Sequence, residues 1–207
     1  MIHTDVPSPI DLRDMKDAKE WERTAMQRPF REAFFAAFAV ELQAVYKPNL
    51  NILDLGSGPG FLAQYILSRI SGVNYTLLDF SAAMHELAMR RLDNVSGSNI
   101  QYLERSFKDG DWADDIDQVD VVVTIQAVHE LRHKRYAPAL FQQVRKLLRP
   151  SGALLFCDHY YGDDGLSNDQ LYMSRSEQLQ ALESAGFRAT EVLVISGRAL
   201  YRALPNH

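Results

Sequence analysis

The chain is 207 residues long, with 46% hydrophobic and 24% charged residues. This composition is close to that of an average soluble globular domain and excludes a disordered or membrane-embedded chain. The formal net charge is −5 at pH 7 and comes without a basic run. Because proteins that hold nucleic acid usually cluster Lys and Arg against the phosphates, a small-molecule substrate is favoured and no nucleic-acid partner is expected.

Cys157 is the only cysteine, and this count excludes intrachain disulfides, cysteine-rich zinc sites and iron–sulfur clusters. The amino terminus carries no apolar core of signal-peptide length, and the longest apolar stretch, 33–40, is too short to span a bilayer. We therefore expect a cytoplasmic monomer or homodimer with no membrane partner.

Residues 1–48 are predicted to form an amino-terminal helical segment that precedes a main domain at 49–207. Three phenylalanines recur there at helical spacing and form one apolar stripe: Phe30, Phe34 and Phe38. One interpretation is a helix that packs on the main domain as ordinary core. A second interpretation adds that residues 13–31 act as a lid over a bound cofactor. The polar end of that cofactor would then lie near Trp21, Arg28 or Arg31.

The main domain alternates apolar runs of strand length with segments of helical periodicity. Strands are predicted at 51–55, 74–78, 100–103, 119–125 and 153–157. Helices are predicted at 60–70, 82–92, 136–148 and 176–185, the last with Ser174 as its N-cap. This alternation predicts an α/β domain with a parallel sheet covered by helices on both faces.

The carboxyl-terminal end departs from this alternation. Two strand-like runs, 191–195 and 198–204, are joined only by Ser196-Gly197. Such a short connection predicts a tight antiparallel hairpin at the end of the sheet.

A glycine-rich turn follows the first predicted strand, where residues 52–60 read I-L-D-L-G-S-G-P-G. Glycines suit this turn because a side chain would hold the backbone away from a ligand. The spacing is not that of a dinucleotide-binding loop, since Phe61 stands where the third small residue belongs, and no Gly-Lys-Ser/Thr follows as in a P-loop. Asp79 ends the second strand, where an acid can accept hydrogen bonds from both hydroxyls of a ribose.

The turn resembles the first motif of the class I S-adenosylmethionine (SAM)-dependent methyltransferases, D/E-x-G-x-G-x-G, and the resemblance extends over residues 50–204. It implies an α/β fold: a three-layer Rossmann-like sandwich with a mostly parallel seven-stranded sheet that ends in an antiparallel hairpin. It also implies an enzyme that transfers a methyl group from SAM to a small-molecule acceptor and releases S-adenosylhomocysteine. An acid near the turn suits SAM, which carries an ammonium and a sulfonium and no phosphate.

The resemblance assigns cofactor-binding roles to ten residues. The methionyl end of SAM would be held by Asp54, Gly56, Ser57, Gly58 and Gly60. Asp79 and Phe80 would hold the ribose. Ser106 and Phe107 would hold the adenine, with Ser106 at the position where the family usually has an acid. Gln126, after the fourth strand, is a further candidate contact.

Two histidines are candidates for catalysis on the acceptor. His129, followed by Glu130, resembles the general base of several small-molecule O-methyltransferases, and an unperturbed imidazole pKa of about 6.5 suits that role. A histidine that only lines the pocket or caps a helix is an equally open interpretation. His159, just beyond the fifth strand, is the rival base, and the acceptor is expected near both histidines, Tyr160 and the amino-terminal segment.

Three other functions compete with methyl transfer. Residues 129–133 read H-E-L-R-H, which matches the H-E-x-x-H signature of zinc hydrolases. Arg132 places a charge between those ligands and no usual third ligand follows, so no metal is expected. A nicotinamide-dependent oxidoreductase is the weaker enzymatic rival. A non-catalytic SAM-binding regulatory module, in which the acceptor pocket has been lost, also fits the sequence.

Overall fold

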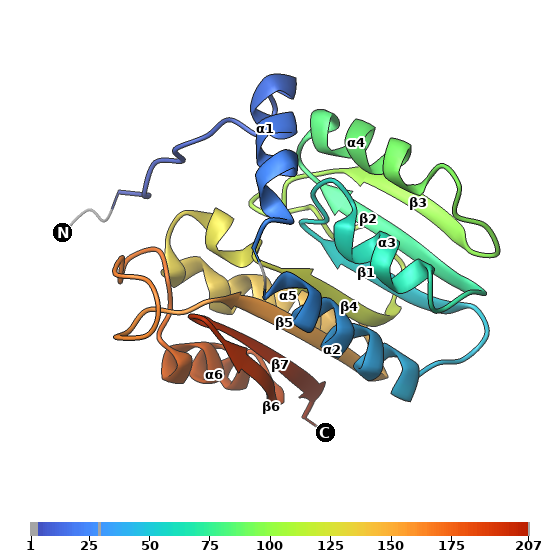
Figure 1. Cartoon of the computed structure of the whole chain (residues 1–207). Helices are drawn as coiled ribbons and strands as arrows, with labels where there is room; N and C mark the ends of the chain where they lie inside the picture. The colour runs from blue at the N-terminus through green and yellow to red at the C-terminus, as the bar shows by residue number, and fades with distance from the viewer. Residues whose placement is uncertain (1–3, 29, 207) are drawn as a thin grey trace.

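A seven-stranded sheet forms the centre of the molecule in the computed structural model, which describes residues 4–28 and 30–206 (Figure 1). Its strand order is β3-β2-β1-β4-β5-β7-β6. The strands are β1 (Leu50–Leu55), β2 (Val73–Asp79), β3 (Asn99–Glu104), β4 (Val119–Ile125), β5 (Leu148–His159), β6 (Phe187–Ile195) and β7 (Arg198–Pro205). β7 runs antiparallel to β5 and β6, and the other neighbouring strands are parallel. The predicted fold class is confirmed.

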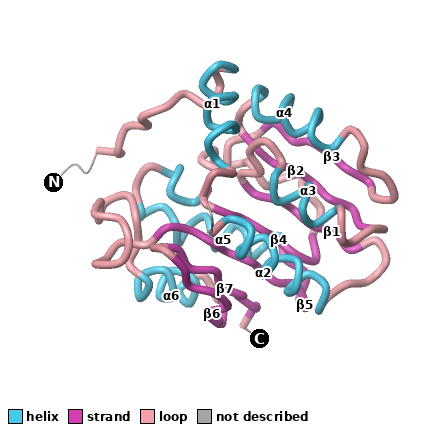
Figure 2. The backbone as a smooth tube through the Cα atoms, viewed as in Figure 1, coloured by secondary structure: helices cyan, strands magenta, loops and turns pink. Residues whose placement is uncertain are grey.

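The described residues form six α-helices, and five of these cover the sheet (Figure 2). The six are α1 (Met15–Ala25), α2 (Arg31–Ala44), α3 (Phe61–Leu67), α4 (Ala82–Leu92), α5 (Ala137–Leu147) and α6 (Arg175–Ser184). One face of the sheet packs against α2, α3 and α4, and the other against α5 and α6. The central strands are almost continuously apolar because both of their faces are covered. None of the described helices is long and apolar enough to cross a membrane.

Several predicted boundaries shift in the structure. The helix at 82–92 and the strand at 119–125 have their predicted ends. The helix predicted to reach residue 70 ends at Leu67, because Ser68 caps it, although Ile70 stays buried and so continues the apolar period. β5 begins at Leu148, five residues before its predicted start. A shift in its register with β4 allows Leu148 to pair with Val119, in addition to the pairing that starts at Ala153.

The final hairpin has the turn chemistry that its sequence predicts. Ser196 and Gly197 connect β6 to β7, with φ angles of 50° and 74°. Two consecutive positive φ values give the backbone twist that a two-residue hairpin needs. The hairpin brings Arg198 opposite His159 in the pairing of β5 with β7.

The amino-terminal segment packs on the main domain. Phe34 and Phe38 of α2 are fully buried against the sheet, and Phe30 meets the Phe34 ring edge-on at 6.5 Å. Phe34 and Phe38 of the predicted stripe are therefore core, whereas Phe30 precedes α2 and is only partly buried. The helix α1 lies instead beside α4, where Ala18 is buried (Figure 1).

Candidate active site

The glycine turn links β1 to α3 and leaves its backbone open on one side. Gly56 has φ of +72°, and a Cβ there would lie 2.4 Å from the Cβ of Ala127. Gly60 has φ of +76° and packs against Ala88 of α4. Gly58 has φ of +55° but no atom within 4 Å of its Cβ position. Glycine is needed at Gly56 for space as well as for conformation, whereas Gly58 faces open space.

Asp79 is held at the end of β2 by the turn itself. Its Oδ2 accepts a hydrogen bond from the Gly58 amide at 2.8 Å, and its Oδ1 accepts one from the Ser81 amide at 3.0 Å. Burial raises the pKa of Asp79 to about 6, although the backbone amides oppose this shift. Each carboxylate oxygen retains a lone pair, so both can accept a further hydrogen bond.

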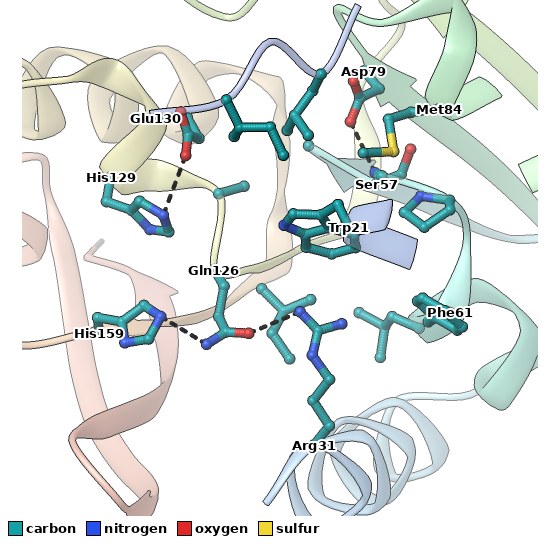
Figure 3. Close-up of a pocket in the computed structure, with 18 of the residues that line it drawn as sticks. Trp21, Arg31, Ser57, Phe61, Asp79, Met84, Gln126, His129, Glu130 and His159 are labelled. Carbon is teal, nitrogen blue, oxygen red and sulfur yellow. Dashed lines mark hydrogen bonds and ion pairs between the residues drawn. The ribbon is translucent and has the colours of Figure 1, made fainter. Parts of the chain in front are cut away.

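A cavity of about 570 Å³ opens beside the turn at the carboxyl ends of the parallel strands. This volume lies within the range of small-molecule sites, and the position is the usual one in open α/β sheets. Ser57, Asp79 and Met84 lie at one end of it, while His129 and His159 lie at the other (Figure 3).

The amino-terminal segment forms one wall of this cavity, with Trp21, Arg28 and Arg31 among the lining residues. The segment is fastened on both sides. The guanidinium of Arg132 donates to the carbonyl oxygens of Val6 and Pro7, at 2.8 and 2.6 Å. On the other side, the Ser81 hydroxyl donates to the carbonyl of Leu12.

His129 is held in an acidic environment. Its Nδ1 lies 2.7 Å from Oδ1 of Asp158, its amide donates to Oδ2 of the same carboxylate at 2.9 Å, and its Nε2 lies 3.4 Å from Glu130. Burial disfavours a charged imidazole, but Asp158 and Glu130 outweigh burial and raise the pKa of His129 to about 10. His129 is therefore protonated at neutral pH.

His159, in contrast, is neutral. Arg31 donates to Oε1 of Gln126 at 2.9 Å, so the amide nitrogen of Gln126 faces Nε2 of His159, also at 2.9 Å. That nitrogen must donate, which leaves the His159 proton on Nδ1. Burial lowers the pKa of His159 to about 3, and the neighbouring cations His129, Arg198 and Arg28 contribute to the shift. The rings of His129 and His159 are 5.4 Å apart.

Gln126 reaches both neighbours from an unusual backbone conformation. Its φ is +54°, which is rare for a residue other than glycine. Its backbone N–H donates to the backbone carbonyl of Cys157 on β5 at 2.7 Å. Backbone strain of this kind persists where surrounding contacts fix it and is frequent at functional sites.

The structure brings most of the predicted site residues to this region. The 570 Å³ cavity is lined by Gly56, Ser57, Gly58, Asp79, Phe80, Phe107, Gln126, His129 and His159. Ser106 lines a second cavity of about 140 Å³ that shares Phe80 and Phe107 with the first.

Asp54, Gly60 and Tyr160 are not among the residues that line either cavity. Asp54 is buried under the turn and accepts a hydrogen bond from the Tyr75 hydroxyl at 2.9 Å. Burial raises the pKa of Asp54 to about 7, although the Tyr75 hydrogen bond opposes this shift. Tyr160 is buried in the core beneath α5 and α6.

Sequence reasoning missed three residues of the site: Asp158, Tyr172 and Arg198. Asp158 precedes a predicted candidate, but only the geometry shows that it pairs with His129. Tyr172 packs against both imidazoles, with ring centroids 5.5 and 5.6 Å away. Arg198 joins the site through the pairing of β7 with β5, and the sequence does not fix that register.

The H-E-L-R-H segment does not form the helix that a zinc hydrolase needs. Its first residues form a short 3-10 helix, Val128–Leu131, which ends at Arg132 with φ of +67°. His133 therefore does not follow His129 on the next turn of a continuous helix. Among the described residues, no three His, Cys, Asp or Glu side chains gather as a metal site requires.

Comparisons with known proteins agree with this geometry. A family model described as a methyltransferase domain matches residues 52–152. The non-reducing polyketide synthase prhL of Penicillium brasilianum is 29% identical over 119 residues, which cover 55% of this chain and 5% of that protein. The glycine/sarcosine/dimethylglycine N-methyltransferase of Actinopolyspora halophila is 27% identical over 147 residues, covering 70% of this chain and 25% of that protein.

The fold also matches that of a solved structure. The structure of the DhpI–SAH complex aligns with a TM-score of 0.68 and 20% identity, covering 93% of this chain and 95% of that one. Residues 52–152 therefore match a methyltransferase domain, and the fold is that of the class I SAM-dependent methyltransferases. It spans about a twentieth of the length of the first polyketide synthase it matches.

The residues present fit SAM, the cofactor of this methyltransferase family. The Ser57 hydroxyl lines the cavity, is buried and has no hydrogen-bond partner among the described residues. Gly58 leaves room for close approach to the backbone, and Asp79 can accept hydrogen bonds. A ligand with a ribose and a polar amino-acid end satisfies all three features.

Proposed function

We propose that this protein is an enzyme of the class that transfers one-carbon groups. It would transfer a methyl group from SAM to a small-molecule acceptor, with both molecules bound in the cavity beside the glycine turn. One observation carries the proposal: the cavity joins a ribose-accepting acid and an open glycine turn to a cluster of ionisable side chains. The first end suits a cofactor and the second a reacting group. A small acceptor also fits the volume, which is within the range for small molecules.

The cofactor-binding roles divide along the cavity. The turn residues Gly56, Ser57 and Gly58 would hold the methionyl end. Asp79 would accept hydrogen bonds from the ribose hydroxyls. Phe80 and Phe107 would flank the adenine beside the smaller cavity, where Ser106 offers one hydroxyl. Asp54 and Gly60 would act indirectly, since they support the turn from behind.

When bound, SAM supplies a methyl group on a sulfonium that an acceptor can attack in line. This chain must then align the acceptor and exclude water. On the amino-terminal side, the cavity is enclosed by Trp21 and by the stretch that Arg132 holds through its hydrogen bond to Val6. On the side of the loop between β5 and α6, it is enclosed by Leu171.

His129 and His159 would divide the proton chemistry between them. Their environments push the two pKa values to opposite sides of neutrality, a pattern that separates acid from base roles in active sites. The neutral His159 can accept a proton from the acceptor at Nε2 once the side-chain amide of Gln126, which donates to this atom, has moved away. The protonated His129, held by Asp158, would stabilise negative charge on the acceptor as it forms.

The open acceptor end favours an enzyme over a regulatory module. A binding module that had lost its acceptor site would have apolar side chains filling this end. Here the end of the cavity is lined by His129, His159 and Tyr172.

The test is a thermal-shift comparison of two cofactors. S-adenosylhomocysteine at 100 times its dissociation constant should add about 2.7 kcal/mol to the free energy of unfolding, and NAD should add nothing. Formation of S-adenosylhomocysteine from SAM is then screened with phenols, carboxylates and amines. Equal shifts with both cofactors, or none with S-adenosylhomocysteine, would refute the proposal. Binding without turnover of any acceptor would favour the regulatory module.

A further inference from the structure

Three arginines line the cavity without a carboxylate partner. Arg28 precedes α2, Arg31 begins α2 and Arg198 begins β7. None of the three forms an ion pair within the described part of the chain, whereas Arg132, also on the cavity wall, is paired with Glu130. The acidic groups nearest them are engaged, since Asp158 binds His129.

Aromatic rings hold two of these guanidinium groups. The Arg31 guanidinium lies 5.1 Å from the centre of the Trp21 ring, and that of Arg198 lies 3.6 Å from the centre of the Phe30 ring. Arg31 is only 4% exposed. In both arginines the Nε atom is buried without a hydrogen-bond partner. Each side chain is thus held in place by a ring, and its Nε–H remains available to donate a hydrogen bond.

The three charges repel one another. Burial lowers the pKa of Arg31 to about 10, with added repulsion from Arg28 and Arg198. Burial and Arg28 also lower the pKa of Arg198. Arg31 is buried, whereas Arg28 and Arg198 are half-buried. A buried charge without an ionic partner is costly, and a guanidinium group binds a carboxylate through paired hydrogen bonds. A bound anion would compensate these charges.

SAM supplies only one carboxylate. Figure 3 shows Arg31 between Gln126 and the side of the cavity that carries Phe61, which is the side of the glycine turn. The carboxylate at the methionyl end would satisfy Arg31. Two positive charges, on Arg28 and Arg198, then remain for the acceptor.

We infer that the methyl acceptor is an organic anion whose carboxylate binds Arg28 and Arg198 while its nucleophilic group faces His129 and His159. This inference rests on the proposed methyl transfer and adds the chemical class of its substrate. It predicts that a neutral amide of the same shape is a poor ligand, because it cannot compensate the two guanidinium charges.

The first experiment separates cofactor from acceptor binding. Calorimetric titration measures the affinity for S-adenosylhomocysteine of Arg28→Gln, Arg198→Gln and Arg31→Gln, with Arg69→Gln as the control. Arg69 stacks on Tyr65 in the same way but lies outside the cavity. The affinity should fall about tenfold in Arg31→Gln and stay within twofold of wild type in the other variants. A tenfold loss in both Arg28→Gln and Arg198→Gln would assign these arginines to the cofactor and overturn the inference.

The second experiment uses matched pairs of an acid and its amide on protein saturated with S-adenosylhomocysteine. The probes are 4-hydroxybenzoate with 4-hydroxybenzamide, glycine with glycinamide, and acetoacetate with acetoacetamide, which offer oxygen, nitrogen and carbon nucleophiles. At least one acid should bind tenfold more tightly than its amide. This preference should fall to less than threefold in Arg28→Gln and Arg198→Gln and persist in Arg69→Gln.

Three results would overturn the inference: no acid binds, amides bind as well as acids, or the preference survives in both variants. Failure of the proposed function itself has a different signature, namely no binding of S-adenosylhomocysteine to the wild-type protein.

Discussion

The two ends of the cavity are built in different ways. The cofactor end comes from one short stretch, residues 56–58, together with Asp79, and it presents mainly backbone. The acceptor end is assembled from side chains of α2, the segment after β4, the end of β5 and the start of β7. The first depends on backbone angles and local spacing, and the second on how distant elements pair. Substitutions at the two ends should therefore fail in different ways.

The largest effect is expected from His129→Gln at the acceptor end. We expect the methylation rate to fall about 10²–10³-fold, because a cation that stabilises negative charge on the acceptor is lost. The affinity for S-adenosylhomocysteine should stay nearly unchanged, since His129 lies at the far end from Asp79. Steady-state kinetics on the best acceptor found by screening, together with calorimetric titration of the cofactor, measures both quantities. A rate equal to that of wild type would exclude a catalytic role for His129.

The pH dependence of the wild-type rate identifies the base. If His159 accepts the proton, the rate at saturating SAM should be flat between about pH 5 and 9, because its pKa of about 3 keeps it neutral throughout. If His129 must first lose its own proton, the rate should rise with pH up to about 10. A rising profile that becomes flat in His129→Gln would reverse the assignment of the two histidines.

A large loss of stability is expected from Gly56→Ala at the cofactor end. Its Cβ would meet Ala127 at 2.4 Å, and its φ of +72° is unfavourable for alanine. Overpacking and the left-handed conformation together should lower the free energy of unfolding by about 2–5 kcal/mol. Gly58→Ala is the matched control, since it carries only the conformational cost of about 1–2 kcal/mol. Equal losses in urea unfolding would mean that space at Gly56 is not limiting.

The cofactor end could be predicted from the sequence because its geometry is local. The glycine spacing and the acid that ends the next strand are fixed by the chain itself, and Gly56, Ser57, Gly58 and Asp79 do line one cavity. The prediction for Asp54 rests on its place in the glycine motif and on its charge. Spacing along a strand does not show that Tyr75 covers this carboxylate from the neighbouring strand.

The acceptor end could be predicted only in part. His129 and His159 were found because each follows a predicted strand. The partner Asp158 and the cation Arg198 depend on side-chain rotation and on the register of β7 with β5, which leaves no trace in a single sequence. The protonated state of His129 and the neutral state of His159 likewise arise from burial and from neighbouring charges. The ordinary pKa of a histidine therefore does not predict them.

An intermediate effect is expected from Asp79→Ala. The affinity for S-adenosylhomocysteine should fall by about 1.5–3 kcal/mol, because hydrogen bonds from the ribose to a charged acceptor are lost. In the wild type, affinity should weaken as pH falls through about 6, since the ionised carboxylate accepts these bonds and protonation removes that capacity. Calorimetric titration between pH 5 and 8 measures both. An affinity independent of pH in the wild type and unchanged in a folded variant would remove Asp79 from the ribose site.

The smallest effect is expected from Asp54→Asn, which tests whether the acid under the turn touches the cofactor. Because Asp54 lines neither cavity, the affinity for S-adenosylhomocysteine should change by less than threefold, against at least a tenfold loss in Asp79→Ala.

The stability of Asp54→Asn should nevertheless change with pH. The folded pKa of about 7 lies above the ordinary value of 3.8, so the contribution of Asp54 to wild-type stability is fully present below pH 3.8 and is lost as pH rises to about 7. Asparagine cannot ionise, and the variant should therefore be more stable than wild type by about 1 kcal/mol at pH 8 and lose this advantage near pH 4. Urea unfolding at both pH values measures the difference. A tenfold loss of cofactor affinity without this change in pH dependence would instead place Asp54 in contact with SAM, as its position in the glycine motif originally implied.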